Sequence, residues 1–193
     1  MNYESTRVTL IQRIKNRLDE NSWEEFTRWY SPYIMAILNR SGVPLHQVED
    51  LNQDILLSIW KSIENFEYKP SECTFRTWLS TISRNKIYDF FARQKTKSNY
   101  ESSTVIPTTL EKSEIDIIIE REWRLYIAGK AFEKVSQQFN EKAIQAYREF
   151  QSGKDVPDIS QKLEISESSV YVYNKRVKDA MSREIILLSR DLE

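Results

Sequence analysis

The chain has 193 residues, enough for one domain or two small ones, and its net charge is −1 at neutral pH. Hydrophobic residues make up 40% and charged residues 30%, with only 3 Gly and 5 Pro, which favours helices over a turn-rich β protein. The near-zero charge excludes a chain that is basic throughout, so nucleic-acid contacts must come from local patches. A single cysteine, Cys73, and the lack of a signal peptide or an apolar run of ~20 residues predict a cytoplasmic protein without membrane insertion.

In the first half of the chain, apolar residues recur at helical spacing. Ser22 and Glu25 form a capping-box signature, which predicts that a helix begins at Ser22. The spacing predicts a further helix over 46–62, a loop over 64–74 and a fourth helix from Phe75 to Arg93, which leads into a basic run ending at Lys97. The expected inward side chains of the middle two helices are Trp23, Phe26, Tyr30, Ile34, Ile37, Leu38, Val48, Leu51, Ile55 and Ile59.

The composition changes after this helix. Residues 98–109 are rich in Ser and Thr and poor in apolar residues, which is typical of a flexible linker. Helical spacing then returns around 115–127 and again around 143–150, where Ser152 and Gly153 follow. The economical interpretation is an all-α protein with two small helical domains joined by a linker. The expected division is 1–97 for the first domain, 98–113 for the linker and 114–193 for the second domain.

The stretch from Val156 to Met181 has the pattern of a helix-turn-helix. Asp155 can cap the first helix, which carries Pro157 in its opening turn. The turn is expected at Glu164 to Ser166, with Ile165 filling the gap between the helices and Ser166 capping the second helix. The turn position usually favours Gly, and Glu adopts the required conformation at some cost.

The outer side of the second helix has the chemistry that a DNA major groove requires. Arg can bond guanine through two hydrogen bonds, hydroxyls can bond bases or phosphates, and an exposed Val can touch a thymine methyl. The alternative is a helical hairpin with a solvated basic face, against which the capped turn and the exposed Val172 argue. We call this outer side the recognition face: Ser168, Ser169, Val172, Lys175 and Arg176, with Tyr171 and Lys178 on its flank.

Four residues of the helix over 46–62 form a second exposed surface, which we call the acidic stripe: Asp50, Gln53, Asp54 and Leu57. Their spacing puts them on one side of the helix, opposite the apolar residues that face the core. Acidic and amide groups around an exposed Leu are typical of a docking surface for a basic, partly apolar partner. Taken alone, a solvated helix face explains the pattern at least as well.

The order of the motifs along the chain favours a docking surface over a solvated helix face. The sequence Asp50-Leu51-Asn52-Gln53-Asp54, then 75–79 (Phe-Arg-Thr-Trp-Leu), then 82–85 (Ile-Ser-Arg-Asn) and a basic tail resembles region 2 of bacterial sigma factors. The helix-turn-helix resembles region 4 of the same family. With these two modules and a short linker, the chain resembles an extracytoplasmic-function (ECF) sigma factor over nearly its whole length.

The resemblance implies a role for each segment. The acidic stripe matches the family's segment that binds the clamp helices of core RNA polymerase, the second domain would meet the polymerase flap, and the helix-turn-helix matches the reader of the promoter −35 element. An anti-sigma factor is a further candidate partner, because many relatives have one. The loop and the fourth helix match the segments that hold the unpaired −10 strand, which agrees with their aromatic and basic side chains. The −10 candidates are Asn65, Phe66, Tyr68, Arg76, Arg84, Asn85, Lys86 and Arg93.

Other classes of protein fit less well. His46 is the only histidine and Cys73 has no partner in sight, so we expect neither an enzyme nor a metal or cofactor site. A one-component repressor or activator would bind its operator alone, usually as a dimer, and has no need of the acidic stripe. An anti-sigma or scaffold protein would have no need of the basic recognition face.

Overall fold

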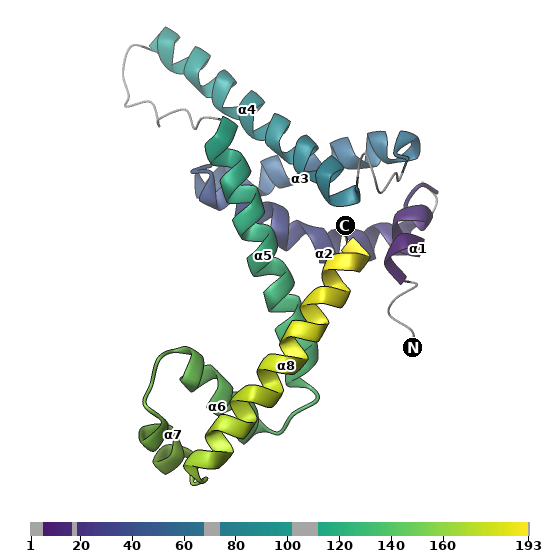
Figure 1. Ribbon diagram of the computed structural model, residues 1–193. Helices are drawn as coiled ribbons and strands as arrows, with labels where there is room; N and C mark the ends of the chain where they lie inside the picture. The colour runs from purple at the N-terminus through teal and green to yellow at the C-terminus, as the bar shows by residue number, and fades with distance from the viewer. Residues whose placement is uncertain (1–5, 17–18, 68–73, 102–111, 193) are drawn as a thin grey trace. The chain divides into compact units, whose positions relative to one another are not determined.

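The computed structural model describes residues 6–16, 19–67, 74–101 and 112–192, and every regular element within these ranges is a helix (Figure 1). The prediction of an all-α fold is therefore confirmed. The chain divides into two compact units, one spanning Met1–Arg124 with Asp191–Glu193 and the other spanning Leu125–Arg190.

The first unit contains four complete helices, a short 3-10 helix and the first part of a fifth helix. The two longest apolar stripes expected from the sequence face its core, because Phe26, Tyr30, Ile34, Val48 and Ile55 are all buried. The prediction of two amphipathic helices in this part of the chain is thus confirmed. The elements are α1 (Thr6–Arg13), α2 (Glu20–Arg40), α3 (Leu45–Ser62), η2 (Ile63–Asn65), α4 (Phe75–Glu101) and the start of α5 (Lys112–Ser136).

Helix α2 begins earlier than the capping-box pattern indicated. Asp19 is its N-cap, and the Asp19 carboxylate accepts hydrogen bonds from the Ser22 backbone N–H at 3.0 Å and the Ser22 hydroxyl at 2.5 Å. These bonds hold the pKa of Asp19 below its usual range. The prediction that Ser22 itself caps the helix was wrong, because an Asp three residues earlier satisfies the free N–H groups first.

The interval between the two predicted domains is shorter than the composition indicated. Helix α4 continues to Glu101 and α5 begins at Lys112, so residues 98–101 and 112–113 are helical. The remainder of the expected linker, 102–111, lies outside the described residues. Helix α4 therefore continues into the first residues of a segment whose Ser-rich composition favours a linker.

The first part of α5 packs within the first unit, which the sequence did not indicate. Ile115, Ile119 and Trp123 repeat every four residues along α5, and all three are buried. The ring of Tyr33 on α2 lies 5.2 Å from that of Trp123, and its hydroxyl donates to the Ile119 carbonyl at 3.4 Å. Burial raises the pKa of Tyr33 to about 12. Each large apolar side chain buried in this way contributes about 1.5–3 kcal/mol.

The second unit is built around the helix-turn-helix. The rest of α5 is followed by α6 (Glu141–Gln151), α7 (Val156–Leu163) and α8 (Glu167–Leu192), which are labelled in Figure 1. An ion pair of 2.7 Å joins Lys134 of α5 to Glu184 of α8, and Gln151 donates to Asn174 at 3.1 Å. The core of this unit consists of Ala146, Ile159, Leu163 and Val170, with Phe150, Val156, Ile165 and Tyr173 packed against it.

The turn between α7 and α8 confirms the predicted geometry. Glu164 has φ 51° and ψ 54°, and it is the only non-glycine residue with positive φ in the described parts of the chain. Ser166 caps α8, since its hydroxyl accepts from the Ser169 N–H at 3.2 Å. Asp155 occupies the N-cap position of α7, but its side chain makes no capping hydrogen bond.

A buried carboxylate, Glu149, ties α6 to α7. Glu149 of α6 contacts Lys162 of α7 at 2.5 Å and Lys154 at 3.4 Å. The hydrogen bond from Lys162 holds the pKa of Glu149 below its usual range. Because the folded pKa is the lower one, the carboxylate contributes its full stabilisation above the ordinary carboxyl pKa, and this contribution is lost as the pH falls from there through the lowered folded pKa.

We therefore expect the acid-induced loss of stability of the second unit to be shallower in Glu149→Gln than in the natural protein. The measurement is hydrogen exchange of α6 to α8 amides from neutral to acid pH. Glu141→Gln is the matched control, because Glu141 is exposed and pairs with neither lysine. Identical pH profiles for the natural protein and Glu149→Gln would contradict the assignment.

Candidate nucleic-acid interface

The acidic stripe lies on the solvent side of α3. Asp50, Gln53, Asp54 and Leu57 are all exposed, and Leu57 keeps 47% of its surface accessible. Gln53 donates to Glu49 at 3.2 Å on the same helix. The predicted orientation of the stripe is therefore confirmed, and none of its side chains is committed to the core.

The acidic stripe and two of the predicted DNA-binding cations share one groove. A cavity of about 510 Å³ lies between α3 and α4, lined by Asp50 and Asp54 on one side and by Lys86 and Arg93 on the other. Lys86 lies 4.0 Å from the Asp54 carboxylate. At that distance a half-exposed pair is weak, so Lys86 can exchange Asp54 for another anion at little cost. Gln47, Leu51, Asp89, Phe90 and Gln94 complete the lining.

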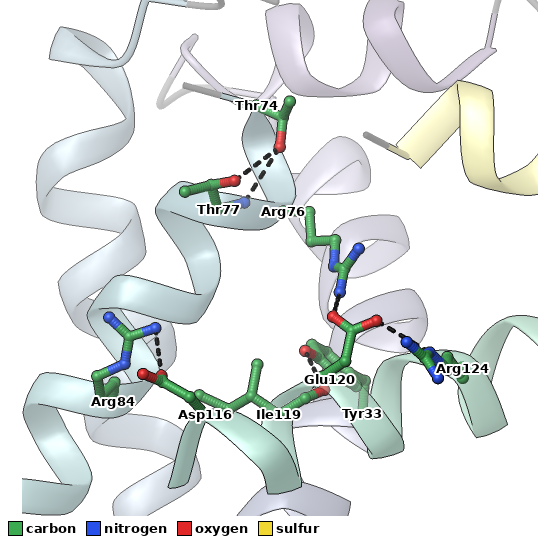
Figure 2. A network of polar contacts seen from close by, with 9 residues as sticks. All are labelled: Tyr33, Thr74, Arg76, Thr77, Arg84, Asp116, Ile119, Glu120 and Arg124. Carbon is green, nitrogen blue, oxygen red and sulfur yellow. Dashed lines mark hydrogen bonds and ion pairs between the residues drawn. The ribbon is translucent and has the colours of Figure 1, made fainter. Parts of the chain in front are cut away.

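The four cations of α4 that were predicted to bind the −10 strand fall into two sets, a division that the sequence did not predict. Lys86 and Arg93 are seven residues apart and line the groove beside α3. Arg76 and Arg84 instead pair with carboxylates of α5 (Figure 2). The predicted −10 cations thus lie on one helix, but two of them line the groove beside α3 and the other two pair with α5.

The pairs on α5 are shown in Figure 2. Arg84 contacts Asp116 at 2.5 Å, and Arg76 forms an ion pair with Glu120, which also accepts from Arg124 at 3.0 Å. The Arg76 guanidinium additionally lies 5.1 Å from the centre of the Trp123 ring. The guanidinium groups of Arg76 and Arg84 are therefore engaged by α5.

The loop before α4 differs from the expectation at its most important aromatic residue. Phe66 is only 4% exposed, and its ring packs 4.8 Å from Trp78 and 5.7 Å from Phe75. A ring buried in this way cannot stack on a base, so Phe66 anchors the start of the loop. Asn65 is exposed beside it, whereas Tyr68 lies outside the described residues.

The recognition face of α8 is accessible as predicted. Lys175 and Arg176 are exposed, and Val172 keeps 47% of its surface accessible although it is apolar. Val170 and Val177 on the opposite side are fully buried. Packing therefore fixes which side of α8 points outward. Ser168, Tyr171 and Lys178 are also exposed, and Ser169 is partly exposed.

Three acidic residues of α5 were missed in the sequence. Asp116 and Glu120 pair with α4, and Glu122 pairs with Arg40 of α2 at 3.5 Å. The available signal was that Asp116 and Glu120 each directly follow a core isoleucine at a four-residue interval. That pattern places them at the edge of the buried face, but it does not identify the partner.

Within the ranges that the structure describes, no group of three or more His, Cys, Asp or Glu could hold a metal ion. None of the helices described is both long enough and apolar enough to span a membrane.

Residues 27–97 match the sequence profile of sigma-70 region 2. The chain is 30% identical over 82 residues to the ECF RNA polymerase sigma factor RpoE of Cereibacter sphaeroides, a match that covers 42% of this chain and 44% of that protein. It is 30% identical over 91 residues to the ECF RNA polymerase sigma factor SigE of Mycolicibacterium smegmatis, covering 47% of this chain and 34% of that protein. The matched part thus spans less than half of either relative.

Proposed function

Because the chain belongs to the extracytoplasmic-function group of the sigma-70 family, with region 2 at residues 27–97, we propose that it acts in the cytoplasm as a sigma factor. It binds core RNA polymerase and directs transcription initiation from specific promoters. The observation that carries the proposal is that a region 2 match and a helix-turn-helix with an exposed recognition face occur on one chain.

In this proposal the acidic stripe binds the clamp helices of the polymerase. Three of its members carry carboxylate or amide groups, and the fourth, Leu57, supplies an apolar contact. Exposed acidic groups around an apolar side chain complement a basic, partly apolar surface. The second unit contacts the polymerase flap, and an anti-sigma factor is a candidate inhibitor.

The surface of α4 holds the unpaired strand of the −10 element. Lys86 and Arg93 supply positive charge on this helix, and the exposed Asn85 offers an amide for a base edge. Arg76 and Arg84 extend this positive surface once their partners on α5 are released. Asn65 of the preceding loop is the remaining described candidate for a base contact.

The recognition face of α8 reads the −35 element in the major groove. Arg176 and Lys175 are the candidates for guanine contacts, Val172 for a thymine methyl and Ser169 for a base or phosphate. Tyr171 and Lys178 lie on the flank, where phosphates run. The polymerase positions this face, so the operator need not be a palindrome.

Run-off transcription tests the proposed function. Core RNA polymerase is incubated with fragmented genomic DNA of the source organism, with and without the purified full chain. New transcripts with defined start sites are expected only when the chain is present. A protein that binds DNA tightly as a dimer without polymerase, and adds no transcript, would instead be a one-component regulator.

Replacing Arg176 by Ala should weaken promoter use by about 1–3 kcal/mol and relax the preference at one base pair of the −35 element. The reason is that loss of a base contact removes discrimination at the base that it read. The measurement is run-off transcription from a set of promoters with every single substitution in the −35 element. Lys178→Ala is the matched control, because loss of a phosphate contact weakens all of these promoters equally. A uniform loss in Arg176→Ala would make Arg176 a phosphate contact.

A further inference from the structure

The first part of α5 carries two carboxylates that occupy arginines of α4. Asp116 pairs with Arg84, and Glu120 pairs with Arg76, both within the first unit (Figure 2). Both arginines are mostly covered, with 23% and 19% of their side-chain surfaces exposed, whereas each carboxylate keeps 44%. In each pair the arginine side chain is therefore more buried than its carboxylate, and α5 covers both arginines.

The apolar register of α5 determines where these carboxylates lie. Ile115, Ile119 and Trp123 turn one side of the helix into the first unit, and all are buried. Asp116 and Glu120 each follow one of the isoleucines, so they emerge at the edge of that buried side. The Trp123 ring beneath Arg76 and the bond from Tyr33 to the Ile119 carbonyl fix the same register. The contact is thus built from several side chains, which come from α2, α4 and α5.

The chemistry of the pairs matches that of a nucleic-acid backbone. A guanidinium offers the same fork of N–H donors to a carboxylate and to a phosphate. Each carboxylate contacts its arginine through one nitrogen, Nη2, and a phosphate bound there would have to displace it. Arg76 and Arg84 are, in the proposed function, part of the surface that holds the −10 strand.

We propose that the first part of α5 is an autoinhibitory segment: Asp116 and Glu120 occupy Arg84 and Arg76 where DNA phosphates would bind. Single-stranded DNA and α5 then compete for the same two guanidinium groups. The free chain binds the unpaired strand weakly, and tight binding requires α5 to leave α4. This inference rests on the proposed function and adds to it a way in which the free protein is kept from DNA.

The test uses the full chain with Asp116→Asn and Glu120→Gln, which remove both charges and keep the side-chain shapes. The probe is fluorescein-labelled oligodeoxythymidine, followed by fluorescence anisotropy over a series of salt concentrations. Each new phosphate contact steepens the salt dependence by ~0.7, so two contacts should steepen it by about 1.4. Affinity would then fall about sevenfold more than in the natural protein between 50 and 200 mM salt.

The matched control carries Glu24→Gln and Glu133→Gln. It loses the same two negative charges and also breaks two ion pairs, Glu24 with Arg28 and Glu133 with Lys130, neither of which involves α4. We expect the first variant to gain affinity and salt dependence and the control to gain neither. An equal gain in both variants, or a gain in neither, would overturn the proposal.

Hydrogen exchange on the natural protein provides a second measurement that does not depend on a variant's folding. Amides 113–124 should exchange faster when oligodeoxythymidine is saturating, because the strand displaces α5 from the arginines. Unchanged or slower exchange in this segment would contradict displacement. Run-off transcription tests the proposed function separately from autoinhibition. If the natural protein directs transcripts but the Asp116 and Glu120 variant shows no change in strand affinity, the proposed function stands and the autoinhibition proposal fails.

Discussion

Changing Asp50 to Arg together with Gln53 to Ala is expected to remove the chain from core RNA polymerase. In the proposed complex the acidic stripe faces a basic partner, so a new positive charge at its first position opposes binding. Placing like charges in contact across an interface costs several kcal/mol, which corresponds to a loss of affinity of roughly a hundredfold or more. The measurement is retention of the purified chain by immobilised core enzyme, with run-off transcription from a responsive promoter as the functional readout.

The stripe variant should retain the natural stability, which makes the result interpretable. Asp50 and Gln53 are exposed, and surface substitutions of this kind usually change stability by less than about 0.5 kcal/mol. The matched control is Glu24→Arg with Asn21→Ala, which makes the same chemical changes on the exposed surface of α2. The control should be retained normally. If immobilised core enzyme retained both variants, the acidic stripe would not be the surface that binds the polymerase.

Replacing Phe75 by Ala should strongly destabilise the first unit. The Phe75 side chain is 1% exposed, and its ring lies within 6.0 Å of the rings of Phe26, Tyr30, Phe66 and Trp78. Removing a buried aromatic ring typically costs about 3–5 kcal/mol, and a whole domain is stable by about 5–15 kcal/mol. The loss would reach α2 and the loop before α4 at once, because Phe75 touches residues of both.

Hydrogen exchange distinguishes the two units, which a single unfolding curve does not. Amides of α2 to α4 should lose most of their protection in Phe75→Ala, whereas α6 to α8 should keep theirs. Leu45→Ala is the control, since Leu45 is a large apolar side chain that is 82% exposed and should contribute little. Native protection of α2 to α4 in Phe75→Ala would show that the aromatic cluster is not the centre of the core.

The features that could be predicted from the sequence are those with a strong local period. Leu51, Ile55 and Ile59 repeat at helical spacing, and the same period that buries them exposes the acidic stripe. The recognition face could be predicted for the same reason, because Val170 and Val177 fix the inner side of α8. In both cases a helix has one apolar side, so the position of the polar side follows.

The remaining features depend on contacts between residues distant in sequence. Arg76 and Glu120 are 44 residues apart, and no local pattern connects them. Phe66 was predicted as a −10 candidate in a loop, and only its packing on Phe75 and Trp78 assigns it to the core. At the start of α2, the capping-box pattern favoured Ser22, and the hydrogen-bond geometry of the structure identifies Asp19 as the N-cap.

The left-handed backbone at Glu164 limits how this part of the chain can vary in evolution. A β-branched residue is disfavoured there, because its Cβ substituents clash at positive φ, whereas Gly, Asn and Asp adopt the conformation more readily. Gly removes the strain but widens the range of unfolded conformations, so part of its advantage is lost, while Asn incurs less of that cost. Because the side chain of Glu164 is exposed and outside the recognition face, we expect substitutions at this position to change stability and to leave the recognition face itself unaltered.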